Sequence, residues 1–136
     1  MNPVPRRRLV LAIVATAAVF AALPILADEP ATITPSALAA RLTAGEAITV
    51  LDVRTPEEFA EGHVPGAVNI PYDQVAQRLA ELESSRNTDI VAYCRSGRRT
   101  GLALETLKAN GFARLLHLQG DLPGWQEAGH PVQATK

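Results

Sequence analysis

Two short stretches of the chain are almost continuously apolar, while the segments between them mix polar and apolar residues at helical spacing. The two apolar runs are Ile48–Val53 and Ile90–Tyr93. Strands that lie inside a parallel sheet and are covered on both faces have this composition. Ala67–Ile70 and Leu115–Leu118 are predicted to be two further strands.

Helices are predicted between these strands from the residues that open and close them. Thr34 and Pro35 begin a helix that runs to Gly45, as expected for a capping threonine followed by proline. Thr55-Pro56-Glu57-Glu58 has the pattern of a capping box that starts a short helix. The other predicted helices are a segment with Val75, Leu79 and Leu82 on one face, a segment with Leu104 and Leu107 that closes at Asn110-Gly111, and a short helix from Leu122 to Ala128 that closes at Gly129.

This alternation of strands and helices predicts an α/β fold with a mainly parallel central sheet of about five strands and helices on both faces. Ligands of such sheets bind beyond the carboxyl ends of the strands. Cys94 follows one apolar strand directly, and Asp52 and Arg54 stand at the end of another. We therefore expect these residues on one rim of the sheet, where we interpret Asp52 as a structural residue that accepts hydrogen bonds from loop amides.

The amino-terminal segment has the features of an export signal. Arg6–Arg8 precede an apolar stretch, residues 9–26, and the small Ala27 stands before Asp28. We expect residues 1–27 to be removed from an exported, periplasmic protein. The apolar stretch is also just long enough to remain as a membrane anchor. Residues 28–136 suit a single domain with one core.

The charge of this predicted mature domain restricts its partners. The chain has thirteen basic and fourteen acidic residues, and loss of the three arginines at positions 6–8 leaves ten against fourteen, a net charge of −4. A mildly acidic domain is a poor partner for nucleic acid. Against this background Arg95, Arg98 and Arg99 form a local group that attracts anions. We expect a monomer that uses no cofactor.

Cys94 is the only cysteine, and the loop that follows it contains a glycine and three arginines. Free cysteines are most often buried and inert, but unpaired charges make such a loop a poor part of a core. The positive end of a following helix and the guanidinium groups favour a thiolate over a thiol. We therefore predict a nucleophilic sulfur that faces the backbone amides of Arg95 through Thr100, with Gly97 permitting the tight turn.

Several motifs, in order and spacing, resemble those of the rhodanese family, from about Thr32 to Val132. They are Leu51-Asp52-Val53-Arg54, Pro56-Glu57-Glu58-Phe59, Gly62-His63-Val64-Pro65-Gly66-Ala67, Asn69-Ile70-Pro71 and Cys94-Arg95-Ser96-Gly97-Arg98-Arg99. The resemblance implies a sulfurtransferase in which Cys94 takes sulfane sulfur from an anionic donor such as thiosulfate. The resulting persulfide would pass its outer sulfur to a thiol, cyanide or a protein acceptor.

The resemblance also assigns roles to single residues. Cys94 would be the catalytic nucleophile, and Asp52, Arg54 and His63 would support the site, the histidine by holding its loop. We expect Arg95 and Arg99 to be the main residues that bind the anionic donor, with Arg98 second to them. The donor-binding residues as a whole would be Arg95, Ser96, Gly97, Arg98, Arg99 and Thr100.

Two other functions stay open. A carrier module would accept sulfur only from a dedicated protein partner. A cysteine-dependent phosphatase or arsenate reductase is disfavoured, because Cys94 to Arg99 spans six residues and the loops of those related enzymes have seven. His117 and His130 show no metal-ligand spacing with each other or with Cys94, so we expect no metal site.

The chain departs from the family pattern at two points. Asp121 stands where the family often has a second glycine, and we expect its carboxylate either to lie near the pocket, where it would repel anionic donors, or to face solvent. The other departure is that only one such domain is predicted, whereas tandem members have a second that encloses the pocket. An open pocket suits a thiol or a protein acceptor.

Overall fold

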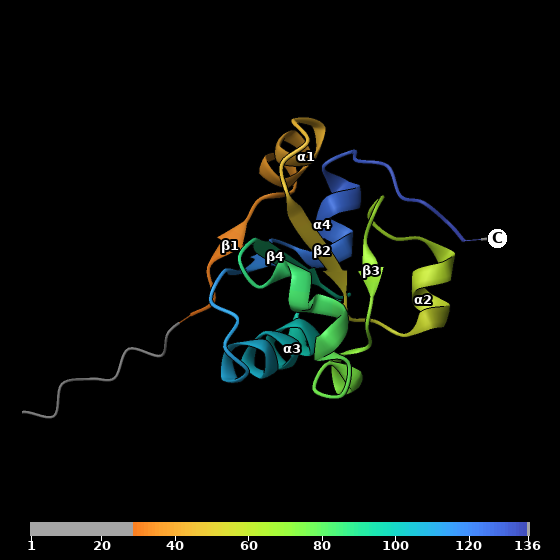
Figure 1. The fold of residues 1–136 in the computed structure, drawn as a ribbon. Coiled ribbons are helices and arrows are strands. Elements are labelled where there is room, and N and C mark those ends of the chain that lie inside the picture. Colours follow the sequence, from red (N-terminus) through yellow and green to blue (C-terminus); the bar gives the residue numbers. More distant parts are fainter. Residues whose placement is uncertain (1–28, 136) are drawn as a thin grey trace, which may run out of the picture.

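A computed structural model of the chain describes residues 29–135 (Figure 1). The predicted export signal, residues 1–27, and the alternative anchor, residues 9–26, lie outside the described residues. Within residues 29–135 no helix has both the length and the apolar composition needed to cross a membrane.

Five parallel strands form one sheet in the order β1-β5-β4-β2-β3. They are β1 (Thr32–Ile33), β2 (Ile48–Asp52), β3 (Val68–Asn69), β4 (Asp89–Tyr93) and β5 (Leu115–Leu118). The prediction of a mainly parallel sheet of about five strands is confirmed. The four strands located from the sequence are all present, with ends that shift by no more than one residue. The two-residue β1 is too short to show a pattern of its own.

Helices cover both faces of this sheet. They are α1 (Pro35–Thr43), α2 (Pro56–Glu61), α3 (Arg98–Ala109) and α4 (Asp121–Glu127), with the 3-10 helices η1 (Tyr72–Gln74) and η2 (Leu79–Ser85). The predicted capping box of α2 is confirmed, because the Glu58 amide donates to Thr55 Oγ1 and the Thr55 amide donates to the Glu58 carboxylate.

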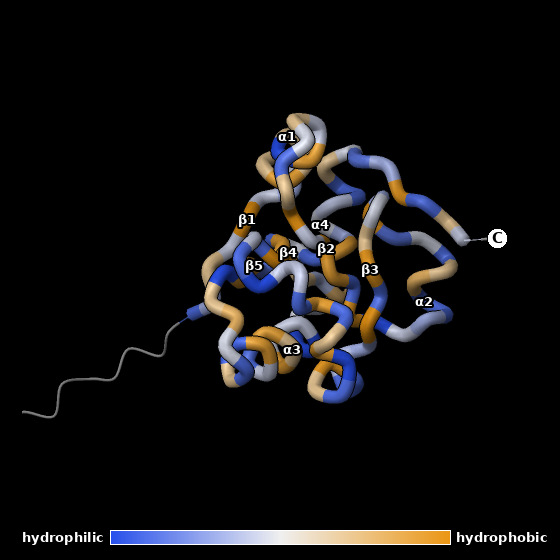
Figure 2. The backbone as a smooth tube through the Cα atoms, in the orientation of Figure 1, coloured by the Kyte–Doolittle hydropathy of each residue, from blue (hydrophilic) through white to orange (hydrophobic). Residues whose placement is uncertain are grey.

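The sheet separates two buried clusters, and neighbouring strand residues belong to opposite ones. Leu51 packs with Leu104 and Leu107 of α3, whereas Val50 packs with Leu38 of α1 and with α4. Figure 2 shows β2 as a mostly apolar segment in the middle of the molecule. Burial on both faces explains why the central strands read as continuous apolar runs.

The segment predicted as a helix with Val75, Leu79 and Leu82 on one face differs in the structure. It is not one α-helix but contains the two 3-10 helices with turns between them. The three apolar side chains still pack into the cluster beneath α3. The buried Ser85, at the end of η2, bonds to the Thr49 hydroxyl of β2.

Candidate active site

Cys94 lies directly after β4, at the carboxyl end of a central strand. The loop turns at Gly97, whose φ of 95° lies in the left-handed region, and α3 starts at Arg98. This turn brings the Gly97 amide to 3.0 Å from Cys94 Sγ, to which it donates a hydrogen bond. Cys94 has no exposed surface, so the sulfur lies under its loop, at the amino end of a twelve-residue helix.

The sequence predicts that several backbone amides face the sulfur, but in this structure one amide donates a hydrogen bond to it. Among the described residues, Gly97 alone donates a backbone N–H to Sγ. The first turn of a helix leaves its N–H groups without intrahelical acceptors, and in α3 these belong to Arg98, Arg99 and Thr100. They give the loop a positive end at which a bound anion is favoured.

A buried carboxylate supports the loop from below. Asp121 Oδ1 accepts hydrogen bonds from the Cys94 amide at 2.9 Å and from the Thr100 hydroxyl at 3.1 Å. His117 Nε2, from β5, lies 2.9 Å from the same oxygen. The backbone of α4 adds a further link, because the Leu122 amide donates to the Cys94 carbonyl. Asp121 is 6% exposed, so of the two expected positions it takes the one near the pocket and does not face solvent.

Asp121 is held in its charged form. Burial alone raises the pKa of this carboxyl, but the hydrogen bonds from His117, the Cys94 amide and Thr100 outweigh burial and leave the pKa below its ordinary value. A negative charge therefore lies beside the backbone of the catalytic candidate. Thr100, with its hydroxyl on Asp121, is fully buried and does not offer that hydroxyl to a donor.

The three arginines of the loop have different surroundings. Arg99 makes a bidentate ion pair with Glu58 of α2, with N–O distances of 2.7 and 3.0 Å. The hydrogen bond from Arg99 lowers the pKa of Glu58 to about 2, against the opposing effect of burial. Arg95, Ser96 and Arg98 are exposed, and the side chains of the two arginines have no hydrogen-bond or ion-pair partner within the described part of the chain.

Asp52 and Arg54 form a buried ion pair at the end of β2. Arg54 contacts the carboxylate through Nε and through Nη2, the latter at 2.6 Å, and Nη2 also donates to the Gly62 carbonyl. Asp52 Oδ1 also accepts the Arg54 amide at 2.9 Å, as the structural interpretation requires. The Tyr93 ring lies below the Arg54 guanidinium, and burial raises the pKa of this tyrosine far above its ordinary range.

His63 holds its loop in place. Its Nδ1 lies 2.7 Å from the Phe59 carbonyl, and its ring stacks on the Phe59 ring with centroids 3.6 Å apart. The His63 backbone pairs with Gln133 in an antiparallel bridge. This arrangement ties the carboxyl-terminal segment to the end of α2, the helix that carries Glu58.

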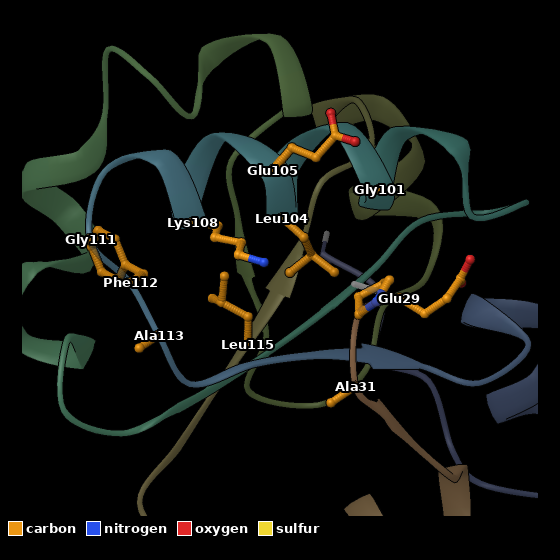
Figure 3. Close-up of a pocket in the computed structure, with 11 residues that line it drawn as sticks. Glu29, Ala31, Gly101, Leu104, Glu105, Lys108, Gly111, Phe112, Ala113 and Leu115 are labelled. Carbon is orange, nitrogen blue, oxygen red and sulfur yellow. The ribbon is translucent and has the colours of Figure 1, made fainter. Parts of the chain in front are cut away.

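The larger cavity is separate from the Cys94 loop. A groove of about 780 Å³ runs along α3 and is lined by Gly101, Leu104, Lys108, Phe112 and Leu115, with Glu29 at its rim (Figure 3). A smaller one of about 340 Å³ lies beside Trp125 and His130. Cys94 is not among the lining residues of either of these two cavities.

Two partners of the loop were not assigned from the sequence. The sequence indicates Glu58 as a capping residue and as part of a family motif, but not as the partner of Arg99. His117 was considered only as a metal ligand, although it bonds Asp121. His117 lies in β5 and Asp121 begins α4, four residues later. This short spacing is the feature of the sequence that could have indicated their contact.

The chain is similar to several known proteins. Residues 34–128 match the family model described as the rhodanese-like domain. A sulfurtransferase from Allochromatium vinosum is 36% identical over 99 residues, which is 73% of this chain and 91% of the relative. A thiosulfate sulfurtransferase from Escherichia coli is 37% identical over 70 residues, which is 52% of this chain and 67% of the relative.

A solved structure shows the same fold. The crystal structure of a rhodanese-related protein from Thermoplasma volcanium superposes with a TM-score of 0.66 at 30% identity, covering 76% of this chain and 97% of the other. Other curated relatives are longer, since this chain covers 49%, 57% and 45% of their lengths. Their activities as whole proteins therefore do not transfer to it.

Proposed function

Because this chain belongs to the rhodanese-like domain family, we propose that it is a sulfurtransferase that carries sulfane sulfur as a persulfide on Cys94. The donor is a small anion such as thiosulfate, and the acceptor is a thiol, cyanide or a protein. The observation that supports this most directly is the position of Sγ, which accepts the Gly97 amide at the positive end of α3. That position favours a negative sulfur, whether thiolate or persulfide.

The reaction has two displacement steps. The Cys94 thiolate attacks the outer sulfur of thiosulfate, the Sγ–S bond forms, and the donor S–S bond breaks as sulfite leaves with the electron pair. An acceptor thiolate or cyanide then attacks the outer sulfur of the persulfide. The Sγ–S bond breaks, its electron pair returns to Cys94, and the free thiolate is restored.

The charged groups of the loop have distinct parts in this scheme. Arg95 and Arg98 are exposed and can meet the sulfonate oxygens of the donor. The Gly97 amide and the positive end of α3 stabilise the charge on the sulfur. Arg99 can bind the donor only after its ion pair with Glu58 breaks. It therefore contributes less to donor binding than Arg95 and Arg98.

Intact-mass measurement of the purified domain after thiosulfate treatment tests the proposal. We expect an adduct of about 32 Da, roughly one sulfur atom, that reducing thiols or cyanide remove and that Cys94→Ser lacks. Absence of this adduct would reject sulfur transfer from small donors. An adduct that forms only with a partner protein would support the carrier alternative, and Cys94-dependent hydrolysis of an aryl phosphate would support the phosphatase alternative.

We also propose that the domain acts after export, because residues 1–27 have the composition of an export signal. Intact mass of the protein recovered from the periplasmic fraction tests this. A chain that begins near Asp28 is expected. A full-length chain in the membrane fraction would favour the anchor, and a full-length chain in the cytoplasm would reject export.

A further inference from the structure

The carboxylate of Asp121 lies close to the reacting sulfur, in a site proposed to bind anions. Its Oδ1 is 2.9 Å from the Cys94 amide nitrogen. Sγ is three covalent bonds from that nitrogen, so standard bond lengths place it within roughly 7 Å of the carboxylate. Oδ2 lies against the loop as well, 3.2 Å from the point where a Cβ on Gly97 would stand.

The backbone at this position is the kind that glycine adopts most easily. Asp121 has a φ of 54° and, among the described residues, is the one non-glycine residue with positive φ. Aspartate tolerates this region better than most residues, but it is still disfavoured. The chain therefore keeps a carboxylate at a position where glycine would fit the backbone with less strain, and this carboxylate both holds the loop and places a negative charge beside it.

The hydrogen bonds to Asp121 stabilise its charged form but do not neutralise its negative charge. Three donors meet Oδ1, from Cys94, Thr100 and His117. Two of these donors are neutral, and the third is neutral whenever the imidazole is unprotonated. The pair of Asp121 and His117 then carries a net charge of −1 beneath the loop, opposed to the positive field of α3 and the exposed arginines.

We propose that Asp121 is a specificity-determining residue that shifts the selectivity of the Cys94 site from dianionic towards monoanionic sulfane-sulfur donors. The carboxylate repels each unit of donor charge, so a dianion loses more than a monoanion. At about 8 Å and an effective dielectric constant of about 40, the repulsion per unit charge amounts to roughly a fivefold change in rate. This inference rests on the proposed sulfur transfer, which it refines by naming the donor class.

A pair of donors that differ by one charge provides the test. Thiosulfate is a dianion and benzenethiosulfonate is a monoanion, and both deliver their outer sulfur to a thiolate. The Sγ–S bond forms while sulfite or benzenesulfinate leaves with the electron pair of the broken S–S bond. Loading of Cys94 is followed by intact mass, with both donors in the same mildly alkaline buffer.

Asp121→Asn removes the charge and keeps an oxygen acceptor. We expect it to raise the thiosulfate rate relative to the benzenethiosulfonate rate by roughly fivefold. Asp121→Gly, which suits the positive φ, is expected to shift the ratio in the same direction, and it replaces the asparagine variant if that protein does not fold. Asp73→Asn, at an exposed aspartate of η1, is the matched control and should leave the ratio unchanged.

An unchanged ratio in both Asp121 variants would overturn the inference, and so would an equal shift in the Asp73 control. A change in thermal stability with no change in ratio would also overturn it, because it would assign Asp121 a purely structural role. If the wild-type protein takes sulfur from neither donor, the proposed function fails, and the inference is tested by alkylation. Iodoacetate is an anion and iodoacetamide is neutral, so Asp121→Asn must then raise the iodoacetate rate relative to that of iodoacetamide, and an unchanged ratio overturns the inference.

Discussion

The ion pair between Glu58 and Arg99 links the loop of the candidate active site to α2, and its strength can be calculated and tested. The pKa of Glu58 is lowered from its ordinary value of 4.5 to about 2, mainly by the hydrogen bond from Arg99 and also by hydrogen bonds from Thr55, against the effect of burial. A shift of this size corresponds to at most about 3 kcal/mol of stability. Since the two side chains are 24% and 28% exposed, solvent screening reduces the expected contribution to about 1–2 kcal/mol.

The coupling can be isolated with a double-mutant cycle of Glu58→Gln and Arg99→Ala. Glutamine preserves the acceptor that caps Thr55, so the cycle reports the charge pair. We expect a coupling energy of about 1–2 kcal/mol at pH 7 from urea unfolding followed by the fluorescence of Trp125. Arg99→Ala alone thus costs some stability, more than expected of a solvated loop charge.

The sign of the pH dependence follows from the lowered pKa of Glu58. A carboxyl whose folded pKa lies below its unfolded value stabilises the protein at pH values above the unfolded pKa of about 4.5. That contribution is lost as the pH falls through the folded value of about 2. At pH 3 the coupling is expected to be less than about half of its value at pH 7. A coupling below about 0.3 kcal/mol at pH 7, or one independent of pH, would refute this account of the pair.

Three further substitutions test other parts of the site, each by urea unfolding. Arg54→Met leaves the Asp52 carboxylate buried without its cation and should cost about 3–5 kcal/mol, and a loss under about 1 kcal/mol would contradict the buried-pair account. Tyr93→Phe removes the hydroxyl that accepts a buried loop amide and should cost about 1–3 kcal/mol, whereas neutrality would mean that water replaces it. Gly97→Ala places a Cβ at a residue with positive φ and against Asp121. It should cost about 1–2 kcal/mol of stability and slow sulfur loading of the folded variant. Unaltered loading would show that the geometry of this turn is not needed for the reaction.

The fold was largely accessible from the sequence because burial on both faces leaves a strong local signal. Ile48–Asp52 and Asp89–Tyr93 are central strands, and their apolar runs are nearly unbroken. β1 was not located because it consists of two residues at the edge of the sheet and gains its order from pairing with β5. The segment around η2 differs from the predicted α-helix because apolar spacing alone does not distinguish an α-helix from 3-10 turns that bury the same side chains.

The site was only partly accessible, for a related reason. The cysteine, the glycine turn and the start of α3 are neighbours in sequence, so a local pattern shows them together. The groups that balance the loop charges come from distant segments. Glu58 is 41 residues from Arg99, and Asp121 is 27 residues from Cys94. A single sequence contains no signal for such pairings until the topology brings the strand ends to one rim.

These distant partners change which arginines are available to a donor. Near Cys94, the charges of Arg54 and Arg99 are each matched by a carboxylate, and Asp121 is matched by hydrogen bonds. Within the described residues Arg95 and Arg98 have no such match and are exposed. Because a paired guanidinium must first give up its carboxylate to bind a ligand, the proposed sulfur transfer would use first these two residues and the amides of α3 to recognise the donor. The expected order, with Arg99 ahead of Arg98, stays a prediction, and the ion pair between Arg99 and Glu58 is an argument for the opposite order.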